Sequence, residues 1–287
     1  MCRAQLSPYW DENGVERYVG RFNLGAVSLN LPRYAIQSNK DKEKFYEILD
    51  KYLDYAKQVH VFTYEKMRKV KGKTNPLLFC EGGCIDSVGY DETIEKCIRS
   101  CTYSFGYIGL EEVSYHMTGK HLHEDSTFAE EVLDYITAKC EQFKKETGLA
   151  FALYGTPSES MCHKLATADR KRFGIIEGLT DKSYYENSFH VGSRFSLDAF
   201  TKQDIEAKLY HKSNGGHISY CEFEMIDNFD AYKAVIDRAM KLGLYFEINF
   251  EKGLCNVCEH EGAMPRGKCP KCQATNISIA SRVCGLR

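Results

Sequence analysis

Four cysteines near the C-terminal end of the chain have the spacing of a metal site. They form two C-x₂-C pairs separated by ten residues, namely Cys255, Cys258, Cys269 and Cys272. Each pair places two thiolates on a tight turn, and two such turns can supply a tetrahedral shell of four sulfur ligands. That shell suits Zn²⁺ in a closed structural site, whereas a catalytic site keeps one position open. The spacing therefore predicts a structural zinc ribbon, with unligated surface cysteines as the alternative.

The residues after this ribbon suggest a second chemistry. The chain continues through a strand-like run to Arg282-Val283-Cys284-Gly285. An isolated glycine is by default a turn or strand-cap residue. A zinc ribbon followed directly by RVCG, however, resembles the C-terminal signature of the anaerobic (class III) ribonucleotide reductases, which are glycyl radical enzymes. The resemblance implies that Gly285 carries a backbone radical, which glycine can host because no Cβ hinders a planar Cα.

Other segments resemble the same family in the same order along all 287 residues. Cys2-Arg3 resembles the cysteine-bearing finger loop, and the run from Gly20 to Arg33 resembles the strand that follows it. Without that context, a cysteine beside the initiator methionine would be read as a disordered terminal thiol. Three later segments also match, namely FGYIGL (105–110), TPSE (156–159) and YYENSFHV (184–191). The resemblance covers the whole chain but only the C-terminal part of a family enzyme.

The resemblance implies a radical reaction that reduces ribonucleoside triphosphates to deoxyribonucleotides, the precursors of DNA. A separate activase, which uses S-adenosylmethionine and an iron–sulfur cluster, would install the radical on Gly285. This radical would take hydrogen from Cys2, and the resulting thiyl would abstract the 3′ hydrogen of the substrate. Loss of the 2′ hydroxyl as water and reduction by formate would complete the reaction. Such transfers need near-contact geometry and exclusion of solvent and oxygen.

The resemblance also gives polar residues a role at this site. Asn23 would lie near the thiol of Cys2, and a purely structural hydrogen bond is the alternative. Residues 156–160 lie between a predicted strand and a predicted helix, where exposed amides and hydroxyl groups can bind substrate phosphates. A plain helix cap is the alternative, because serine and threonine favour that position without a ligand. The candidate phosphate-binding residues are Thr156, Ser158, Glu159 and Ser160.

Two further clusters contain possible metal ligands. One consists of two C-x₃-C pairs, Cys80, Cys84, Cys97 and Cys101. That spacing is unusual for a zinc ribbon, so buried free thiols are the preferred interpretation. The other cluster is a group of histidines, His116, His121 and His123. A polar loop that contains histidines is more common than a metal site of this kind.

The first half of the chain contains a predicted strand and a predicted helix. Residues 24–32 (LGAVSLNLP) combine apolar and small residues and are expected to form a buried strand that ends at Pro32. Residues 40–70 are predicted to form a helix, with Gly72 and Pro76 marking its exit. Its apolar stripe has spacings of three and four residues and comprises Phe45, Ile48, Leu49, Tyr52, Ala56 and Val59.

A helix–glycine–strand rhythm follows. Residues 103–110 read as a strand, and Thr127 with Glu130 predicts a capping box at the start of a helix. Gly148 closes that helix before a strand at 149–154. A later helix at about 228–242 ends at Gly243 and precedes a strand at 244–250. The rhythm predicts an α/β fold with mostly parallel strands. The resemblance narrows it to part of a ten-stranded α/β barrel of the glycyl radical enzyme type.

Three parts are expected along the chain. Residues 1–250 would form the C-terminal portion of the catalytic barrel, including the finger-loop cysteine. Residues 251–274 would form the four-cysteine zinc ribbon, and residues 275–287 the glycyl radical loop. The family is typically dimeric, so the resemblance implies a homodimer.

Composition excludes several classes of protein. With 43% hydrophobic and 27% charged residues, the chain is expected to bury a sizeable core. Its 13 cysteines occur without a secretory signal, which favours metal or redox chemistry over a disulfide framework. The net charge of −2 offers no basic field for nucleic acid. The longest apolar run, GLAFALYG, is far shorter than the roughly 18 residues of a membrane span. We expect a cytoplasmic protein that binds neither membranes nor nucleic acid directly.

Three features depart from the family pattern. Leu286 stands where the family has an aromatic residue after the radical glycine, and the sequence stops at Arg287 where members continue with a short tail. Met1, in place of glycine, precedes Cys2. The N-terminal half of a family enzyme, with its second active-site cysteine and nucleotide-sensing domain, has no counterpart in the sequence. We therefore expect a fragment, one product of a split gene, or a remnant.

Two other functions stay open from the residues alone. The first is a non-catalytic fragment that docks with an N-terminal reductase chain or with the activase. Co-purification of such a partner would favour it. The second is a zinc-ribbon binding module on an unrelated α/β domain. That module predicts a basic surface, whereas the charge of this chain is balanced.

Overall fold

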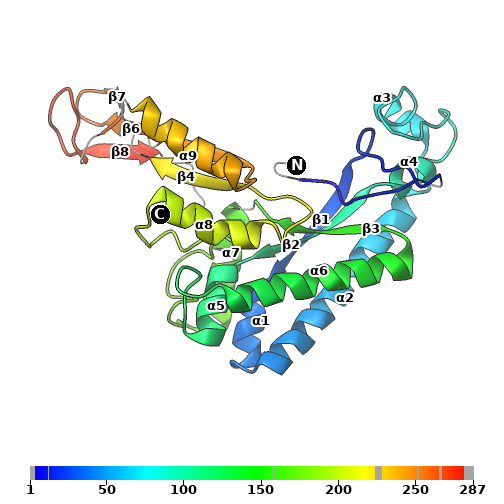
Figure 1. Cartoon of the computed structure of the whole chain (residues 1–287), viewed down its shortest axis with the longest axis horizontal. Helices are drawn as coiled ribbons and strands as arrows, with labels where there is room; N and C mark the ends of the chain where they lie inside the picture. Colours follow the sequence, from blue (N-terminus) through cyan, green and yellow to red (C-terminus); the bar gives the residue numbers. More distant parts are fainter. Residues whose placement is uncertain are drawn as a thin grey trace.

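The computed structural model describes residues 4–11, 13–157, 159–223, 228–250, 252–264 and 267–280. Its centre is a three-stranded parallel sheet in the order β1-β2-β3, formed by Asn23–Asn30, Thr102–Ile108 and Ala150–Gly155 (Figure 1). Every residue of β2 and β3 is buried. Continuous burial of this kind is typical of parallel strands, which are covered on both faces. The α/β class predicted from the helix–strand rhythm is confirmed.

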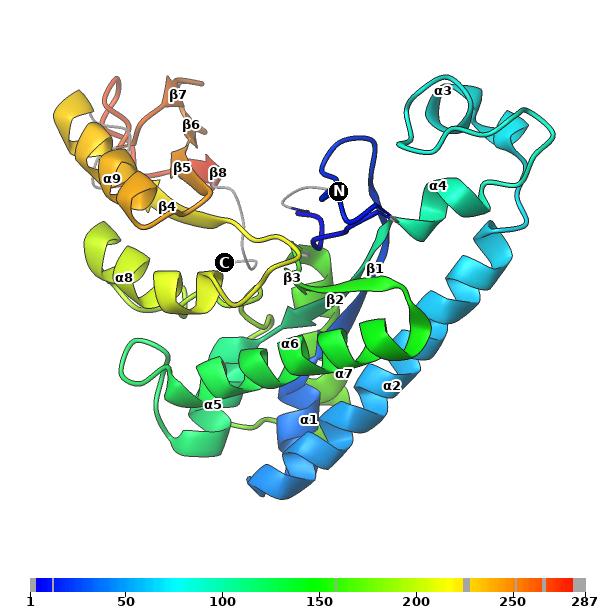
Figure 2. The same ribbon diagram turned by 45° about the vertical axis from the view of Figure 1, so that its right-hand side comes forward.

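Long helices pack against one face of this sheet. They are α2 (Lys42–Met67) and α6 (Thr127–Thr147), whose apolar stripes meet the aromatic residues of β2 and β3 in the main core. In Figure 2, α6 passes across the strands and α2 runs diagonally past the β1 side of the sheet. The main core therefore lies between the sheet and these two helices. The opposite face of the sheet is not covered by α2 or α6.

The remaining helices of the first two thirds of the chain are shorter. Helix α1 (Leu31–Ser38) follows β1, helix α5 (Leu110–Thr118) follows β2 and helix α7 (Glu159–Phe173) follows β3. A 3₁₀ turn (Gly72–Thr74) and two short helices, α3 (Pro76–Phe79) and α4 (Glu95–Arg99), lie between α2 and β2. Each strand of the sheet is thus followed directly by a helix.

A second pair of parallel strands extends the architecture. β4 (Ser219–Phe223) pairs with β5 (Phe246–Phe250), and helices α8 (Ala199–Tyr210) and α9 (Phe229–Lys241) precede the two strands. The segment before β4 is tied to β3 by backbone hydrogen bonds. The Gly215 N–H donates to the Leu153 carbonyl (2.6 Å), and the Gly155 N–H donates to the Gly216 carbonyl (2.8 Å). This segment therefore joins the β1-β2-β3 sheet to the β4-β5 sheet.

A small antiparallel sheet ends the described chain. Its strands are β6 (Lys252–Cys255), β7 (Glu261–Gly262) and β8 (Ile277–Ala280), in the order β7-β6-β8. Figure 1 shows it beside β4 and α9, at the opposite end of the molecule from α3 and α4. The four cysteines of the predicted zinc ribbon lie on this sheet and its turns.

Predicted element boundaries differ from the observed ones by up to three residues, and two of the differences have a clear local cause. The first strand ends at Asn30, because the Asn30 side chain accepts a hydrogen bond from the Arg33 N–H and caps α1. Pro32 stands in the first turn of α1, where a missing N–H costs nothing. The capping box predicted at Thr127 is not formed, since the N-cap of α6 is Ser126, whose hydroxyl donates to Glu130 (2.8 Å).

The buried stripe of α2 also differs from its prediction. Phe45, Leu49 and Ala56 are buried as expected, whereas Val59 is 50% exposed. Its place is taken by His60, which lies under the sheet with its Nε2 3.1 Å from the Ser104 carbonyl. Burial lowers the pKa of His60 to about 4. A neutral histidine can thus fill a position that a scan for apolar residues alone cannot find.

Within the described residues, none of the helices combines the length and the apolar character required to traverse a bilayer.

Candidate functional site

Small and polar side chains lie on the face of the sheet that α2 and α6 do not cover. Successive side chains of a strand point to opposite faces. In β2, Tyr103, Phe105 and Tyr107 belong to the main core. Ser104 and Gly106 therefore lie on the other face. The candidate residues Asn23 and Thr156 both lie on this face, where Asn23 contacts Ser104 and Thr156 contacts Ser28.

Asn23 is the first residue of β1, and its side chain contacts this face of the sheet. Its side-chain amide donates to the hydroxyl of Ser104, and its Oδ1 accepts from the Gly25 N–H (3.1 Å). The structural hydrogen bond considered as the alternative for Asn23 is therefore present. A contact between Asn23 and the thiol of Cys2 stays a prediction, because Cys2 lies outside the described residues.

Thr156 follows β3 at its carboxyl end and is only 3% exposed. Its hydroxyl lies 2.9 Å from the hydroxyl of Ser28 in β1. Helix α7 starts three residues later, and Ser160 is exposed in its first turn. Ser158 lies outside the described residues, and only the backbone of Glu159 is described. Thr156 and Ser160 thus flank the N-terminus of a fifteen-residue helix, the position predicted to bind phosphate.

Gln5 and Ser7, which follow Cys2 closely in the sequence, are hydrogen-bonded to the segment beside β3 and to the start of β2. The Gln5 N–H donates to the Gly215 carbonyl (2.8 Å), and the Ser7 N–H donates to the Thr102 hydroxyl (3.0 Å). Gly215 and its neighbour Gly216 are themselves bonded to β3, next to Thr156. Residues 5–7 are therefore connected, through Gly215 and Gly216, to residues 156–160, which we call the candidate phosphate loop. Gly285 lies outside the described residues.

The four ribbon cysteines come together as their spacing predicts. Their sulfur atoms all lie within 4.8 Å of one another. Two pairs are closer, with 3.5 Å between the Sγ atoms of Cys255 and Cys272 and 3.6 Å between those of Cys258 and Cys269. A tetrahedral site with Zn–S bonds of about 2.3 Å separates its sulfur atoms by about 3.8 Å. The cluster therefore fits Zn²⁺ after adjustments of the sulfur separations by about 1 Å or less.

The backbone around Cys255 favours the thiolate form of this ligand. The N–H groups of Cys258 and Val257 point at the sulfur of Cys255 and lower its pKa to about 6. Cys255 and Cys269 are buried, whereas Cys272 is exposed. A half-exposed site with four sulfur ligands leaves no open position for substrate, which is typical of structural metals.

The other cysteine and histidine clusters do not form comparable sites. Cys84, Cys97 and Cys101 are buried free thiols, and Cys80 is a half-buried one. Burial raises the pKa of Cys101 to about 12, which keeps the thiol protonated. Within the described part of the chain, the ribbon cysteines are the only group of three or more possible ligands close enough to share one ion.

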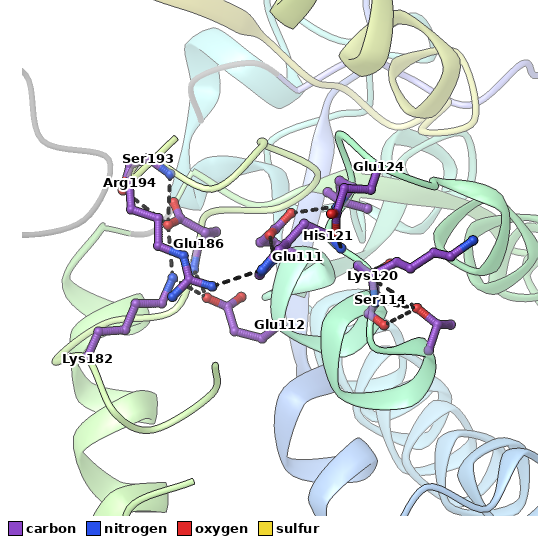
Figure 3. A network of polar contacts seen from close by, with 12 residues as sticks. Glu111, Glu112, Ser114, Lys120, His121, Glu124, Lys182, Glu186, Ser193 and Arg194 are labelled. Atoms are coloured by element: carbon purple, nitrogen blue, oxygen red, sulfur yellow. Dashed lines mark hydrogen bonds and ion pairs between the residues drawn. The ribbon is translucent and has the colours of Figure 1, made fainter. Parts of the chain in front are cut away.

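A buried network of charged residues is a feature that the sequence analysis missed. Glu111 and Glu112 open helix α5, directly after β2, and both are buried (Figure 3). Lys182 bridges Glu112 (2.6 Å) and Glu186 (2.9 Å). Glu186 in turn accepts from the N–H and the hydroxyl of Ser193. The network holds the loop that contains the YYENSFHV segment against the end of the sheet.

Glu111 pairs with one of the histidines singled out in the sequence. The Nδ1 of His121 lies 2.7 Å from Glu111, and the ring stacks on Tyr115 with 4.3 Å between centroids. Burial and the neighbouring charge of Glu112 raise the pKa of Glu111 to about 8, and burial lowers the pKa of His121. Both shifts disfavour the charged forms, so Glu111 and His121 form a packed polar pair.

Replacement of Glu111 by glutamine should change the pH dependence of stability. The folded pKa of about 8 exceeds the unfolded pKa of 4.5, so the wild-type chain loses stability as the pH rises through this interval. We expect a loss on the order of 2 to 4 kcal/mol in the free energy of unfolding between pH 5 and pH 8. Glu111→Gln should remove this loss, because glutamine does not titrate. Urea unfolding at a series of pH values measures it.

The control for this prediction is Glu141→Gln, on the exposed side of α6. That variant should keep the wild-type pH dependence. An unchanged dependence in Glu111→Gln would show instead that Glu111 is ionised throughout the interval.

Another buried carboxylate, Asp169, fixes helix α7 to the sheet. Asp169 is fully buried and accepts from the side-chain amide of Asn30 (2.8 Å) and from the hydroxyl of Tyr185 (3.0 Å). Its other oxygen pairs with Arg33 (2.5 Å). These partners come from the end of β1, from α1 and from the YYENSFHV loop. Asp169 therefore determines where α7, and with it the candidate phosphate loop, lies.

Comparison with known proteins gives one consistent result. Residues 1–286 match the family model of anaerobic ribonucleoside-triphosphate reductase. The enzyme of that name from Haemophilus influenzae is 35% identical over 298 residues, which cover 99% of this chain and 42% of the relative. The Escherichia coli enzyme is 33% identical with the same coverage. The relative from Enterobacteria phage T4 is 33% identical over 264 residues, or 90% of this chain. The chain spans 42% of the length of these curated relatives.

Solved structures agree on the fold. The anaerobic ribonucleotide reductase from Thermotoga maritima with MES in the active site has a TM-score of 0.70 and 22% identity, and covers 98% of this chain and 46% of that chain. The same enzyme in complex with dATP and CTP has a TM-score of 0.64, also at 22% identity, over 93% of this chain and 44% of that chain. On the strength of the family match over residues 1–286, this chain belongs to the anaerobic ribonucleoside-triphosphate reductase family.

Proposed function

We propose that this chain is the C-terminal catalytic portion of an anaerobic ribonucleoside-triphosphate reductase. One observation supports it beyond the family match. The residues that follow Cys2 and the candidate phosphate loop at Thr156 lie against the same short segment, Gly215 and Gly216, at the carboxyl end of β3. A substrate held by its phosphates at this loop would therefore lie close to the chain that carries the proposed thiyl cysteine.

Three parts of the chain would each form one component of the reductase. Residues 1–250 would supply half of a ten-stranded α/β barrel, in which the parallel sheets β1-β2-β3 and β4-β5 would be consecutive parts of the wall. Residues 251–274 would form the zinc ribbon, and residues 275–287 the glycyl radical loop. The remaining strands would come from the N-terminal portion of a reductase, on the same or a separate chain. Assembly of two such enzymes as a homodimer belongs to the same proposal.

The proposed reaction replaces the 2′ hydroxyl of a ribonucleoside triphosphate by hydrogen. The Gly285 radical takes the hydrogen atom of the Cys2 thiol, and the thiyl then takes the 3′ hydrogen of the ribose. The 2′ hydroxyl leaves as water. Formate supplies the two electrons and becomes carbon dioxide, and the 3′ hydrogen returns from Cys2. Thr156, Ser158, Glu159 and Ser160 would hold the phosphates, and Asn23 would lie near the thiol.

Two cofactor requirements follow from this proposal. Cys255, Cys258, Cys269 and Cys272 would hold one Zn²⁺, which would fold the ribbon that precedes the radical loop. A separate activase with an iron–sulfur cluster and S-adenosylmethionine would remove one hydrogen atom from Gly285. The close cluster of four sulfur atoms supports the first requirement, and the RVCG run directly after the ribbon supports the second.

Electron paramagnetic resonance tests the proposal. The zinc-loaded chain would be incubated without oxygen with the cognate activase, a reductant and S-adenosylmethionine. We expect a doublet signal, because the Gly285 radical keeps one Cα hydrogen. Gly285→Ala should give no signal, and Gly89→Ala, remote from the ribbon and with only the Glu92 side chain beside the added Cβ, should give the doublet. A folded, zinc-loaded wild-type chain without the doublet would favour a non-catalytic chain that docks with a reductase or an activase.

A further inference from the structure

A glycine stands in the middle of the fully buried strand β2. Gly106 pairs in register with Ser28 of β1 on one side and with Tyr154 of β3 on the other. Glycine weakens a strand interior, because it loses more conformational freedom than other residues and has no side chain to pack. A glycine at such a position often marks a close approach by another group.

The approaching groups are two hydroxyls. A Cβ at position 106 would lie 2.0 Å from the Oγ1 of Thr156 and 2.8 Å from the Oγ of Ser28. Real Cβ atoms do not come so close to an oxygen, so any side chain here would displace one hydroxyl or both. Because Gly106 leaves this space open, Ser28 from β1 and Thr156 from beyond β3 meet across β2 at 2.9 Å.

We propose that Ser28 and Gly106 are positioning residues for the triphosphate of the substrate. Gly106 provides the space and Ser28 holds the hydroxyl of Thr156 at the start of the phosphate loop. The inference rests on the proposed function, in which Thr156 contacts the phosphates. It adds two residues from the strands beneath the loop to the groups that determine substrate affinity.

Each hydroxyl has only one proton, and this determines which of Ser28 and Thr156 donates to the other when a phosphate is bound. A threonine hydroxyl has one proton and can accept as well as donate. If Thr156 donates its proton to a phosphate oxygen, it must accept from Ser28. Ser28 then donates, and a hydroxyl that accepts one hydrogen bond becomes a stronger donor for the next. Thr156 is almost fully buried and Ser28 is partly buried, so water competes little for the Thr156 hydroxyl.

Calorimetric titration of the full chain with CTP, with tripolyphosphate and with cytidine tests the inference. Ser28→Ala should weaken binding of CTP and tripolyphosphate by about 3- to 10-fold and leave cytidine binding unchanged. Ser28→Thr keeps the hydroxyl and should restore the affinity. Gly106→Ala, which pushes the Thr156 hydroxyl away, should weaken triphosphate binding about 10-fold. Gly25→Ala is the matched control in β1, because a Cβ there has no neighbour within 4 Å.

The variant Thr156→Val separates this inference from the proposed function. It should weaken triphosphate binding by about 10-fold or more, and adding Ser28→Ala to it should cause no further loss. A loss in Thr156→Val without a loss in Ser28→Ala and Gly106→Ala would overturn the positioning role alone. Unchanged binding in Thr156→Val, or no binding of either phosphate probe by the wild-type chain, would overturn the phosphate site together with the inference. Loss of cytidine affinity in Ser28→Ala would show a general structural effect and would also overturn it.

Discussion

Removal of zinc from the ribbon should unfold residues 252–280 and leave the α/β part of the chain folded. The reason is that the ribbon has almost no apolar core. Leu254, Val257 and Ile279 are 39%, 62% and 52% exposed, and the buried side chains of this sheet are those of Cys255 and Cys269. Small domains without a core depend on metal, and structural zinc contributes about 10 to 16 kcal/mol of apparent binding free energy at pH 7. No other interaction in the described ribbon approaches that magnitude.

Limited proteolysis with and without a chelator measures this effect. The wild-type chain should release one equivalent of zinc and then be cleaved within the ribbon, while the melting transition of the α/β part persists. Cys269→Ser should behave like the chelated protein. Cys80→Ser, at a half-buried free thiol outside the ribbon, should keep its zinc and its resistance to protease. Resistance of the ribbon in the metal-free protein would contradict the prediction.

Replacement of Asp169 by alanine should lower the free energy of unfolding by about 3 kcal/mol or more. Asp169 is fully buried and accepts from Asn30, Arg33 and Tyr185. Its removal leaves a guanidinium, an amide and a hydroxyl without their common partner. Loss of one member of a buried ion pair costs about 3 to 5 kcal/mol, because the remaining charge stays desolvated. Arg33 is 25% exposed, so water recovers part of that cost and the lower end of the range applies.

Urea unfolding measures the loss, with Asp237→Ala as the matched control. Asp237 pairs with Lys233 on the surface of α9 at 2.5 Å, and exposed pairs of this type contribute less than about 0.5 kcal/mol. Asp169→Asn should be intermediate, because it keeps an acceptor but loses the charge. Equal stability of Asp169→Ala and the control would mean that Asp169 does not anchor α7. A shared loss of triphosphate binding in Asp169→Ala would also be expected, since α7 follows the phosphate loop.

Much of the fold could be predicted from short stretches of sequence. Gly148 ends α6 in the left-handed conformation, as a glycine after an amphipathic helix predicts. The strands after α6 and α9 were likewise predicted within about two residues of their observed bounds. Local rules suffice in these places because turns, caps and hydrophobic spacing act between residues that are near in the chain.

Competing local signals were harder to rank. The serine and the threonine at the start of α6 are adjacent, and only the structure shows that Ser126 occupies the N-cap position. His60 occupies the core side of α2, where the apolar stripe suggested Val59. Whether Val59 or His60 is buried depends on which side of the helix packs against the sheet. That direction is set by the whole core, not by the helix itself.

The sequence by itself determined the four-cysteine cluster, the α/β class and the family. The ribbon cysteines lie within 18 residues of one another, so spacing alone constrains their geometry. Only the tertiary structure decided that Ser28 and Thr156 meet over Gly106, and that Asp169 joins Asn30 and Tyr185. These partners are separated by up to 139 residues, and no pattern in the intervening chain encodes their distance. Parallel strands pair residues through long crossovers, so their register, and with it these contacts, becomes defined only when the core packs.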